Sequence, residues 1–206
     1  MRITGRLQAL ARLVVQPASA HCDTEDGPVV TAGRRALLTG NVNHALAWVP
    51  EADEAEVRQA FAAASTTSGD EPAAVERRFL ETLVRLHRAG EGAGFAGIMP
   101  SGTPWPPAVT AADRALAEGV LAPLEPLVEA TAWPDVQRRF AAARALRDHD
   151  VDDVATGRRF VAAYVGYVHQ ALHHAVRHAA PDALHHTVQV TEHAVPAGVP
   201  TPRRGE

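Results

Sequence analysis

Six consecutive residues carry the densest set of reactive groups in the chain: His21, Cys22, Asp23, Thr24, Glu25 and Asp26. Cys22 is the only cysteine, so an internal disulfide is excluded, and a free thiol, an intermolecular bridge or a metal ligand remains. A thiolate favours a soft or borderline metal ion, and carboxylates add hard oxygen ligands. We therefore predict a site for iron, zinc, nickel or copper to which His21, Cys22, Asp23 and Asp26 contribute.

Each of these residues also has a structural alternative. Asp26 could cap the helix that opens at Pro28, and Asp23 or Thr24 could close an Asx or Ser/Thr turn. The metal-ligand role and the structural role both fit the spacing of the acidic residues. The alternative for Cys22 is a small buried apolar group, and its polar and charged neighbours argue against that role.

Two of the eleven histidines lie on the apolar faces of expected long helices. His87 follows three apolar residues at helical spacing, Leu80, Leu83 and Val84. His169 shares a face with Val161, Tyr164, Val165, Val168 and Leu172. Because helix bundles commonly build metal sites from inward side chains of facing helices, we predict that His87 and His169 complete the site. The alternative for each is a neutral core histidine that donates a hydrogen bond to a backbone carbonyl.

Further candidate ligands lie on the same two helices. His173 is one turn after His169, an i, i+4 pair suited to one ion. Glu81 precedes His87, and its slightly favoured alternative is an i, i+4 ion pair with Arg85. A solvated C-terminal tail with loose metal affinity is expected for the remaining late histidines, His174, His178, His185, His186 and His193.

Two parts of the chain resemble each other. Val30–Leu37 matches Val109–Leu116, and Phe61–Ala64 matches Phe140–Ala143, both at an offset of 79 residues. His87 pairs with His169 at an offset of 82, and Cys22 aligns with Ser101. We therefore predict a duplicated scaffold with pseudo-twofold symmetry, in which one half alone carries the ligand cluster.

The composition favours an all-α fold and bounds the function. Of the 206 residues, 46% are hydrophobic, with alanine the most frequent of them, and only 5% are aromatic, which suits packed helices better than a sheet. The net charge is -4, and acidic and basic residues are interspersed, so the sequence has no basic stripe that would bind nucleic acid. No apolar run reaches the ~20 residues of a transmembrane segment. The expected helices cover 28–38, 42–49, 50–64, 72–89, 108–118, 120–131, 135–148 and 152–179.

These patterns predict a domain organisation with three parts. An N-terminal extension (1–20) precedes a helical bundle (21–180), whose repeat halves cover about 21–90 and 100–180, and a mobile tail (181–206) rich in histidine and proline follows. The extension is basic and ends in Ala18-Ser19-Ala20, which is typical of a signal-peptidase site, but Arg12 interrupts its apolar stretch. We expect a cytoplasmic protein, with export as the alternative. Cleavage after Ala20 would add the α-amine of His21 to the ligand set.

Two motifs resemble known families. His-Cys-Asp-Thr-x-Asp-Gly-Pro-Val at 21–29 and Glu-Thr-Leu-Val-Arg-x-His-Arg-Ala-Gly-Glu-Gly at 81–92 resemble an uncharacterised prokaryotic family over about 21–175, which implies no activity. More weakly, residues 21–27 resemble the His-Cys-Asp-x-x-Cys-Gly hook of nickel superoxide dismutase, which sits on a helical bundle. The resemblance implies a ligand role for His21 and Cys22. Asp26 occupies the place of the second cysteine, which makes a harder site, better suited to iron or zinc.

Three functional hypotheses follow. The first is a metal-binding helical protein that acts as a metal-dependent oxidoreductase on a small molecule, such as a reactive oxygen species, at an open coordination position. The second is a non-enzymatic metal-binding or metal-sensing protein. The third is a helical interaction module in which Cys22 is a redox-sensitive thiol. The sequence leaves the oligomeric state open.

Overall fold

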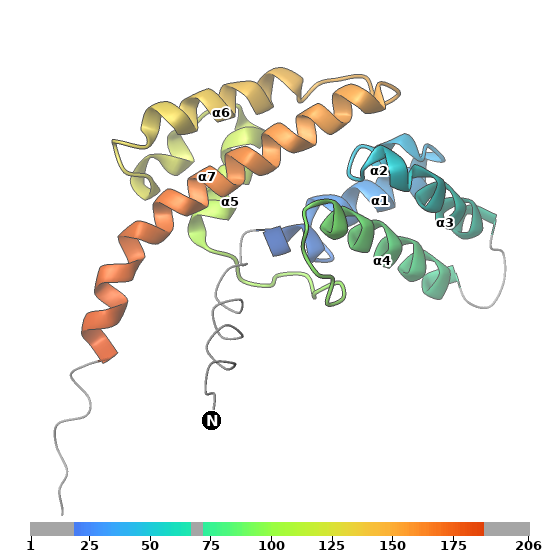
Figure 1. Cartoon of the computed structure of the whole chain (residues 1–206), viewed down its shortest axis with the longest axis horizontal. Helices are drawn as coiled ribbons and strands as arrows, with labels where there is room; N and C mark the ends of the chain where they lie inside the picture. Colours follow the sequence, from blue (N-terminus) through green and yellow to red (C-terminus); the bar gives the residue numbers. More distant parts are fainter. Residues whose placement is uncertain (1–18, 67–71, 188–206) are drawn as a thin grey trace, which may run out of the picture.

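The computed structural model describes residues 19–66 and 72–187, and the regular structure within these ranges is helical (Figure 1). The first half comprises η1 (Ser19–Asp23), α1 (Pro28–Thr39), α2 (Asn43–Leu46), η2 (Glu51–Asp53), α3 (Glu54–Thr66) and α4 (Pro72–Gly90). The second half comprises α5 (Pro107–Glu118), η3 (Ala122–Leu127), α6 (Trp133–Leu146) and α7 (Val154–Thr187). The prediction of an all-α fold is confirmed.

Each half has its own apolar core. In the first half, α1 packs against α2 and α4, and α3 packs against α4 around Leu46, Phe79 and Leu83. In the second half, α5 and α6 pack against α7 around Val136 and Tyr167. Full burial of a side chain of this size contributes about 1.5–3 kcal/mol, so the two cores stabilise the two halves largely from within.

A seam joins the two cores. Half-buried Trp48, which follows α2, packs against both cores, and Val154 at the start of α7 packs against the first-half core. Polar contacts cross the same seam, because the side-chain amides of Asn41 and Asn43 both donate to Asp152. Figure 1 shows α7 running along the second half, with its first turns near α2 and the first half to one side.

Helices α1 and α5 begin and end alike. Each has a proline in its first turn, which pre-sets the backbone for a helix. Each ends at a glycine in the left-handed conformation, Gly40 (φ 69°) and Gly119 (φ 74°), whose N–H caps the helix at Ala36 and Ala115 respectively. These ends recur at the predicted offset, while the pseudo-twofold relation of the halves stays a prediction.

Several helix boundaries differ from the sequence-based expectation, and three of these differences are informative. The prediction of a helix over 120–131 was wrong, because Pro123 and Pro126 leave only the six-residue 3₁₀ segment η3. The helix expected over 42–49 is limited to the single turn α2. Helix α7 passes Pro181 and ends at Thr187, so the helix continues there although proline has no N–H to donate to the preceding turn.

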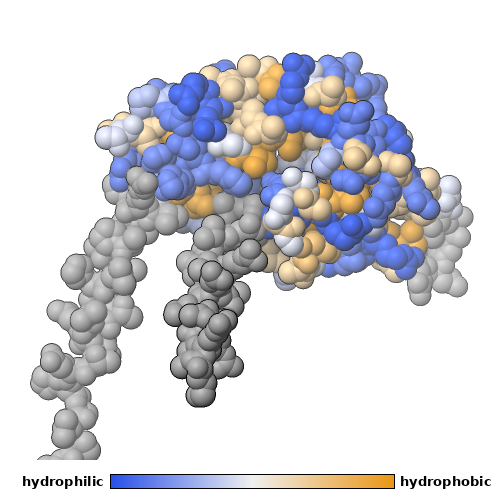
Figure 2. Space-filling model, viewed as in Figure 1, coloured by the Kyte–Doolittle hydropathy of each residue, from blue (hydrophilic) through white to orange (hydrophobic). Residues whose placement is uncertain are grey.

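The predicted N-terminal extension up to residue 18 and the tail from residue 188 lie outside the described residues, as do the side chains of 176–187. Hydrophilic and hydrophobic residues intersperse over the face in Figure 2, without one continuous apolar surface. Among the helices in the described ranges, none combines the length and the apolar character that crossing a bilayer requires.

Candidate functional site

The segment that carries His21 and Cys22 is fixed by the linker between the two halves, residues 91–106. Met99 of the linker donates its backbone N–H to Asp23 O (2.8 Å), and Glu25 N–H donates to Met99 O (2.9 Å), which forms an isolated parallel bridge. The Asp26 carboxylate accepts hydrogen bonds from Ser101 Oγ and Gly102 N, both at 3.0 Å. The linker therefore holds η1 against the first half rather than leaving it as a free end.

The turn itself is compact because of Gly27. A Cβ atom at Gly27 would clash with His21 O, and it would lie 2.9 Å from both Cys22 O and Thr24 Oγ1. Thr24 Oγ1 in turn donates to His21 O (3.2 Å). This packing buries the segment, so that His21 is 5% and Cys22 1% exposed.

Hydrogen bonds assign the tautomer of His21. The Tyr164 hydroxyl donates its single proton to Asp113 Oδ1 (2.6 Å), so its oxygen accepts a hydrogen bond from His21 Nε2 at 2.8 Å. In the neutral tautomer that donates from Nε2, Nδ1 of His21 carries the lone pair. Cys22 Sγ lies 3.9 Å from this nitrogen, and its thiol is the donor. The imidazole is thus oriented by Tyr164 and presents Nδ1 beside the sulfur.

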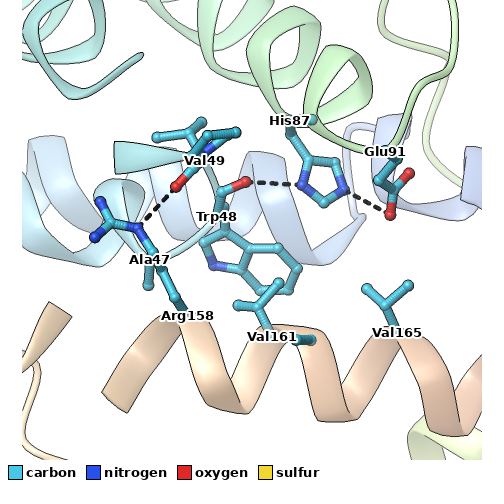
Figure 3. A pocket seen from close by; sticks show the side chains of 11 residues that line it. Ala47, Trp48, Val49, His87, Glu91, Arg158, Val161 and Val165 are labelled. Carbon is cyan, nitrogen blue, oxygen red and sulfur yellow. Dashed lines mark hydrogen bonds and ion pairs between the residues drawn. The ribbon is translucent and has the colours of Figure 1, made fainter. Parts of the chain in front are cut away.

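His87 is oriented in the complementary way. Its Nδ1 lies 2.8 Å from Trp48 O and must donate to that carbonyl, and its burial lowers the pKa of the imidazole, which favours the neutral form. Nε2 therefore carries a lone pair, and it faces Glu91 Oε1 at 3.5 Å (Figure 3). Neither Nε2 nor Oε1 has a hydrogen-bond partner, although His87 is only 3% exposed. Two buried acceptors therefore face each other with no donor between them.

Two carboxylates lie beside one buried guanidinium next to these groups. Arg88, itself buried, lies 3.4 Å from Asp23 and 3.1 Å from Glu91, so one guanidinium serves two carboxylates. Burial outweighs the attraction of Arg88 and raises the pKa of Asp23 to about 6. Burial, followed by the charges of Glu91 and Asp23, raises the pKa of the Cys22 thiol well above its usual value.

His169 lies at the edge of the same cluster. Its side chain is largely exposed, yet partial burial lowers the pKa of the imidazole, and the charges of Glu91, His21 and Arg88 also act on it. The structure thus gathers His21, Cys22, Asp23 and His87 around the seam, with His169 within their electrostatic reach.

Three other predicted ligands lie elsewhere. Asp26 is exposed and does not cap α1, since its carboxylate is taken by Ser101 and Gly102. Glu81 pairs with Arg77 (2.8 Å), one turn before it, rather than with Arg85. His173 is exposed, and its ring lies against His174, with 5.3 Å between ring centroids. Within the described ranges, no three His, Cys, Asp or Glu side chains form a group that could hold a metal ion.

Four residues of this cluster were not among the sequence-based candidates: Glu91, Arg88, Asp113 and Tyr164. Glu91 had a usable signal, because it stands four residues after His87, directly beyond the glycine that ends α4. Tyr164 was placed on the apolar face of its helix, which is correct for its ring but hides the role of its hydroxyl.

A pocket of about 290 Å³ opens beside His87. Its walls come from the turn after α2 and from α7, and Figure 3 shows Val161 and Val165 of α7 opposite Trp48, with His87 and Glu91 at one end. The seam between the halves therefore holds both the polar cluster and a cavity that reaches one edge of it.

These features define a helical protein with a buried cluster of imidazole, thiol and carboxylate groups between its two halves. Residues 26–170 match the model of a family of unknown function, DUF6448, and the chain belongs to that family. No curated protein and no solved structure matches the chain. The expectation of an uncharacterised family is confirmed, while the nine-residue signature and the likeness to the nickel hook stay predictions. His87, Glu91 and Tyr164 lie in the matched range, whereas His21 and Cys22 precede it.

Proposed function

We propose that the protein binds one transition-metal ion through His21 Nδ1, Cys22 Sγ and His87 Nε2. The observation that carries this proposal is the orientation of the two imidazoles. Each donates one ring N–H, to Tyr164 or to the Trp48 carbonyl, and so presents its other nitrogen to the cluster. Histidines that ligate metals characteristically donate the other N–H to a carbonyl or carboxylate-linked partner, which fixes the ring.

The charge of the cluster supports a cation. Binding would place positive charge beside Asp23 and Glu91, which share one guanidinium, and it would replace the thiol proton of Cys22. The alternative of an interaction module with Cys22 as a redox-sensitive thiol has less support, because Cys22 is 1% exposed and a buried thiol of raised pKa reacts slowly.

Two imidazoles and one thiolate form a borderline ligand set, for which zinc and iron are the first choices, with copper and nickel next. His169, at the edge of the cluster, is proposed as a further ligand that a small side-chain movement would recruit. A remaining open position would suit an oxidoreductase that acts on a small molecule, and a closed site would suit a metal carrier or sensor.

The test is metal content. The full chain and a chain that begins at His21 are purified and their metals are counted by mass spectrometry, because the second chain supplies the α-amine that export would create. We expect about one ion per chain, lost in Cys22→Ser and in His87→Ala and retained in His44→Ala, a histidine on α2 with no contact to the cluster. Circular dichroism checks that each variant is folded.

A folded Cys22→Ser or His87→Ala variant that keeps its metal would overturn the proposed site, and His169→Ala decides whether that residue is a ligand. Turnover of peroxide or superoxide by the loaded chain separates an oxidoreductase from a carrier.

We further propose that the two halves arose by duplication of one helical unit. The matching caps of α1 and α5 and the order of the helices in each half support this. The ligand segment then belongs to one copy, and the second copy contributes Tyr164 and Asp113, which orient it.

A further inference from the structure

The pocket between the turn after α2 and helix α7, here called the seam pocket, combines aliphatic walls with two hydrogen-bond donors. Trp48 and Arg158 line it together with Gly90 and the side chains that form its walls, which are Ala47, Val49, Pro50, Val161, Ala162 and Val165. In the part of the chain that the structure describes, neither the indole N–H of Trp48 nor Nη1 of Arg158 makes a hydrogen bond. An occupant with an apolar body and an acceptor group would satisfy both donors.

The two donors lie away from the buried polar cluster. In Figure 3 the Arg158 side chain and the ring nitrogen of Trp48 lie toward one end of the pocket, and His87 is at the other end with Glu91. Nε2 of His87 and Oε1 of Glu91 are closed to solvent, so an occupant does not contact these two atoms. The polar group of an occupant therefore belongs beside Arg158 and Trp48.

The charge at this end of the pocket favours an anion. The Arg158 guanidinium donates from Nε to Val49 O (2.9 Å) and from Nη2 to the Glu54 carboxylate. Glu54 also pairs with Arg58, whose Nη2 lies 3.1 Å from it, so one carboxylate faces two guanidinium groups. A second carboxylate at Nη1 of Arg158 would balance the charge, and it can accept from a guanidinium and an indole N–H at the same time.

The size of the pocket limits the occupant. A volume of about 290 Å³ corresponds to roughly ten water-sized groups at about 30 Å³ each. We propose that the seam pocket binds a small monocarboxylate of at most about ten non-hydrogen atoms, with its carboxylate on Arg158 and Trp48 and its apolar body against Val161 and Val165. This second site does not depend on the proposed metal site.

The experiment uses benzoate, which fits this size, and benzamide, which has the same shape without the charge. NMR of the isotopically labelled full chain follows the three tryptophan indole N–H signals, and the signal lost in Trp48→Phe is that of Trp48. We expect benzoate to shift the Trp48 signal until it saturates and to leave those of Trp105 and Trp133 in place. Benzamide should bind about tenfold more weakly, because it lacks the charge that Arg158 recognises.

Two pairs of variants locate the carboxylate and the apolar body. Arg158→Met should weaken benzoate binding about tenfold. Its matched control is Arg58→Met, which removes the other guanidinium on Glu54 but does not line the pocket, and which should change the affinity much less. Ala162→Trp fills the pocket from an exposed position of its wall and should abolish binding. Ala155→Trp, at an exposed alanine of α7 outside the pocket, should leave it unchanged.

The proposal is overturned if benzoate leaves the Trp48 signal in place, or shifts the signal of Trp105 or Trp133 instead. Benzamide binding as tight as that of benzoate would contradict recognition of a carboxylate by Arg158. Equal binding of benzoate by Ala162→Trp and Ala155→Trp would show that the ligand lies outside the pocket. Should circular dichroism show that Arg158→Met is unfolded, benzamide and the two alanine variants decide.

Discussion

Replacing Gly27 by alanine tests whether the turn around His21 and Cys22 is as tightly packed as the structure indicates. Gly27 has φ −72°, which any residue adopts, so the substitution acts through space and not through backbone conformation. The added methyl group would clash with His21 O and would lie 2.9 Å from Cys22 O and Thr24 Oγ1. Two of these three neighbours are backbone carbonyls, so relief requires the whole turn to shift.

Overpacking of this kind costs about 1–3 kcal/mol, and two rigid neighbours favour the upper half of that range. Alanine also restricts the unfolded chain, which returns about 0.4–1 kcal/mol. The net loss should be about 1–2 kcal/mol, a fall in Tm of about 2–8 °C for a chain of this size. Because the shifted carbonyls belong to His21 and Cys22, metal occupancy should fall as well.

Gly94→Ala is the matched control, because a Cβ atom there meets nothing within 4 Å. Urea unfolding and metal counting of both variants form the assay. We expect Gly94→Ala to match the parent protein in stability and in metal content. If Gly27→Ala were as stable as Gly94→Ala and equally loaded with metal, the compact turn would not be what positions the ligands.

Three further predictions concern hydrogen bonds and pH. Tyr164→Phe removes the acceptor of His21 Nε2 and should lower the unfolding free energy of the metal-free protein by about 1–3 kcal/mol in urea. Tyr167→Phe should cost less, because the Tyr167 hydroxyl makes only a 3.4 Å hydrogen bond. Equal losses in the two variants would contradict the assigned tautomer. Burial raises the pKa of Asp23 from its usual 3.8 to about 6, so the folded state binds more protons between these values. As the pH falls from 7 to 4, the unfolding free energy of the parent should therefore rise by about 1–3 kcal/mol relative to that of Asp23→Asn. A difference in unfolding free energy that does not change with pH would refute this. Asp26 has the opposite sign, because its pKa is lowered to about 2: Asp26→Asn should destabilise at pH 6 and lose this effect as the pH approaches 2, and an effect that persists at pH 2 in thermal melts would show that the carboxylate charge is not its cause.

Local sequence rules predict the helices of this fold well where packing and capping agree. The stripe of Leu80, Leu83 and Val84 indicates the buried face of α4, and all three side chains are at most 2% exposed. The glycines after α1 and α5 mark their ends, because both adopt a left-handed conformation that other residues avoid. The predictions fail over 42–49 and 120–131, where only short helical segments form, and at Pro181, which α7 passes.

The site was less predictable because its contacts join residues far apart in the chain. The bridge between Met99 and the segment after Cys22 depends on how the linker lies, and no periodicity reports that. The hydrogen bond from Tyr164 to Asp113 depends on how α7 packs against α5. Arg88 gave no signal at all, since a charged residue in the last turn of a helix is ordinarily solvated and favourable to the helix dipole.

The arrangement at the seam is difficult to explain by stability alone. A buried ion pair rarely stabilises more than apolar residues of the same volume, and here one guanidinium faces two carboxylates beside the neutral imidazole of His87 and a protonated thiol. Elsewhere the chain follows the usual rules, with alanine, valine and leucine filling both cores. Polar residues that violate these rules in one place are characteristic of functional sites, where binding repays the cost in stability. The cost of the cluster around His87 therefore supports the proposal that it binds a cation.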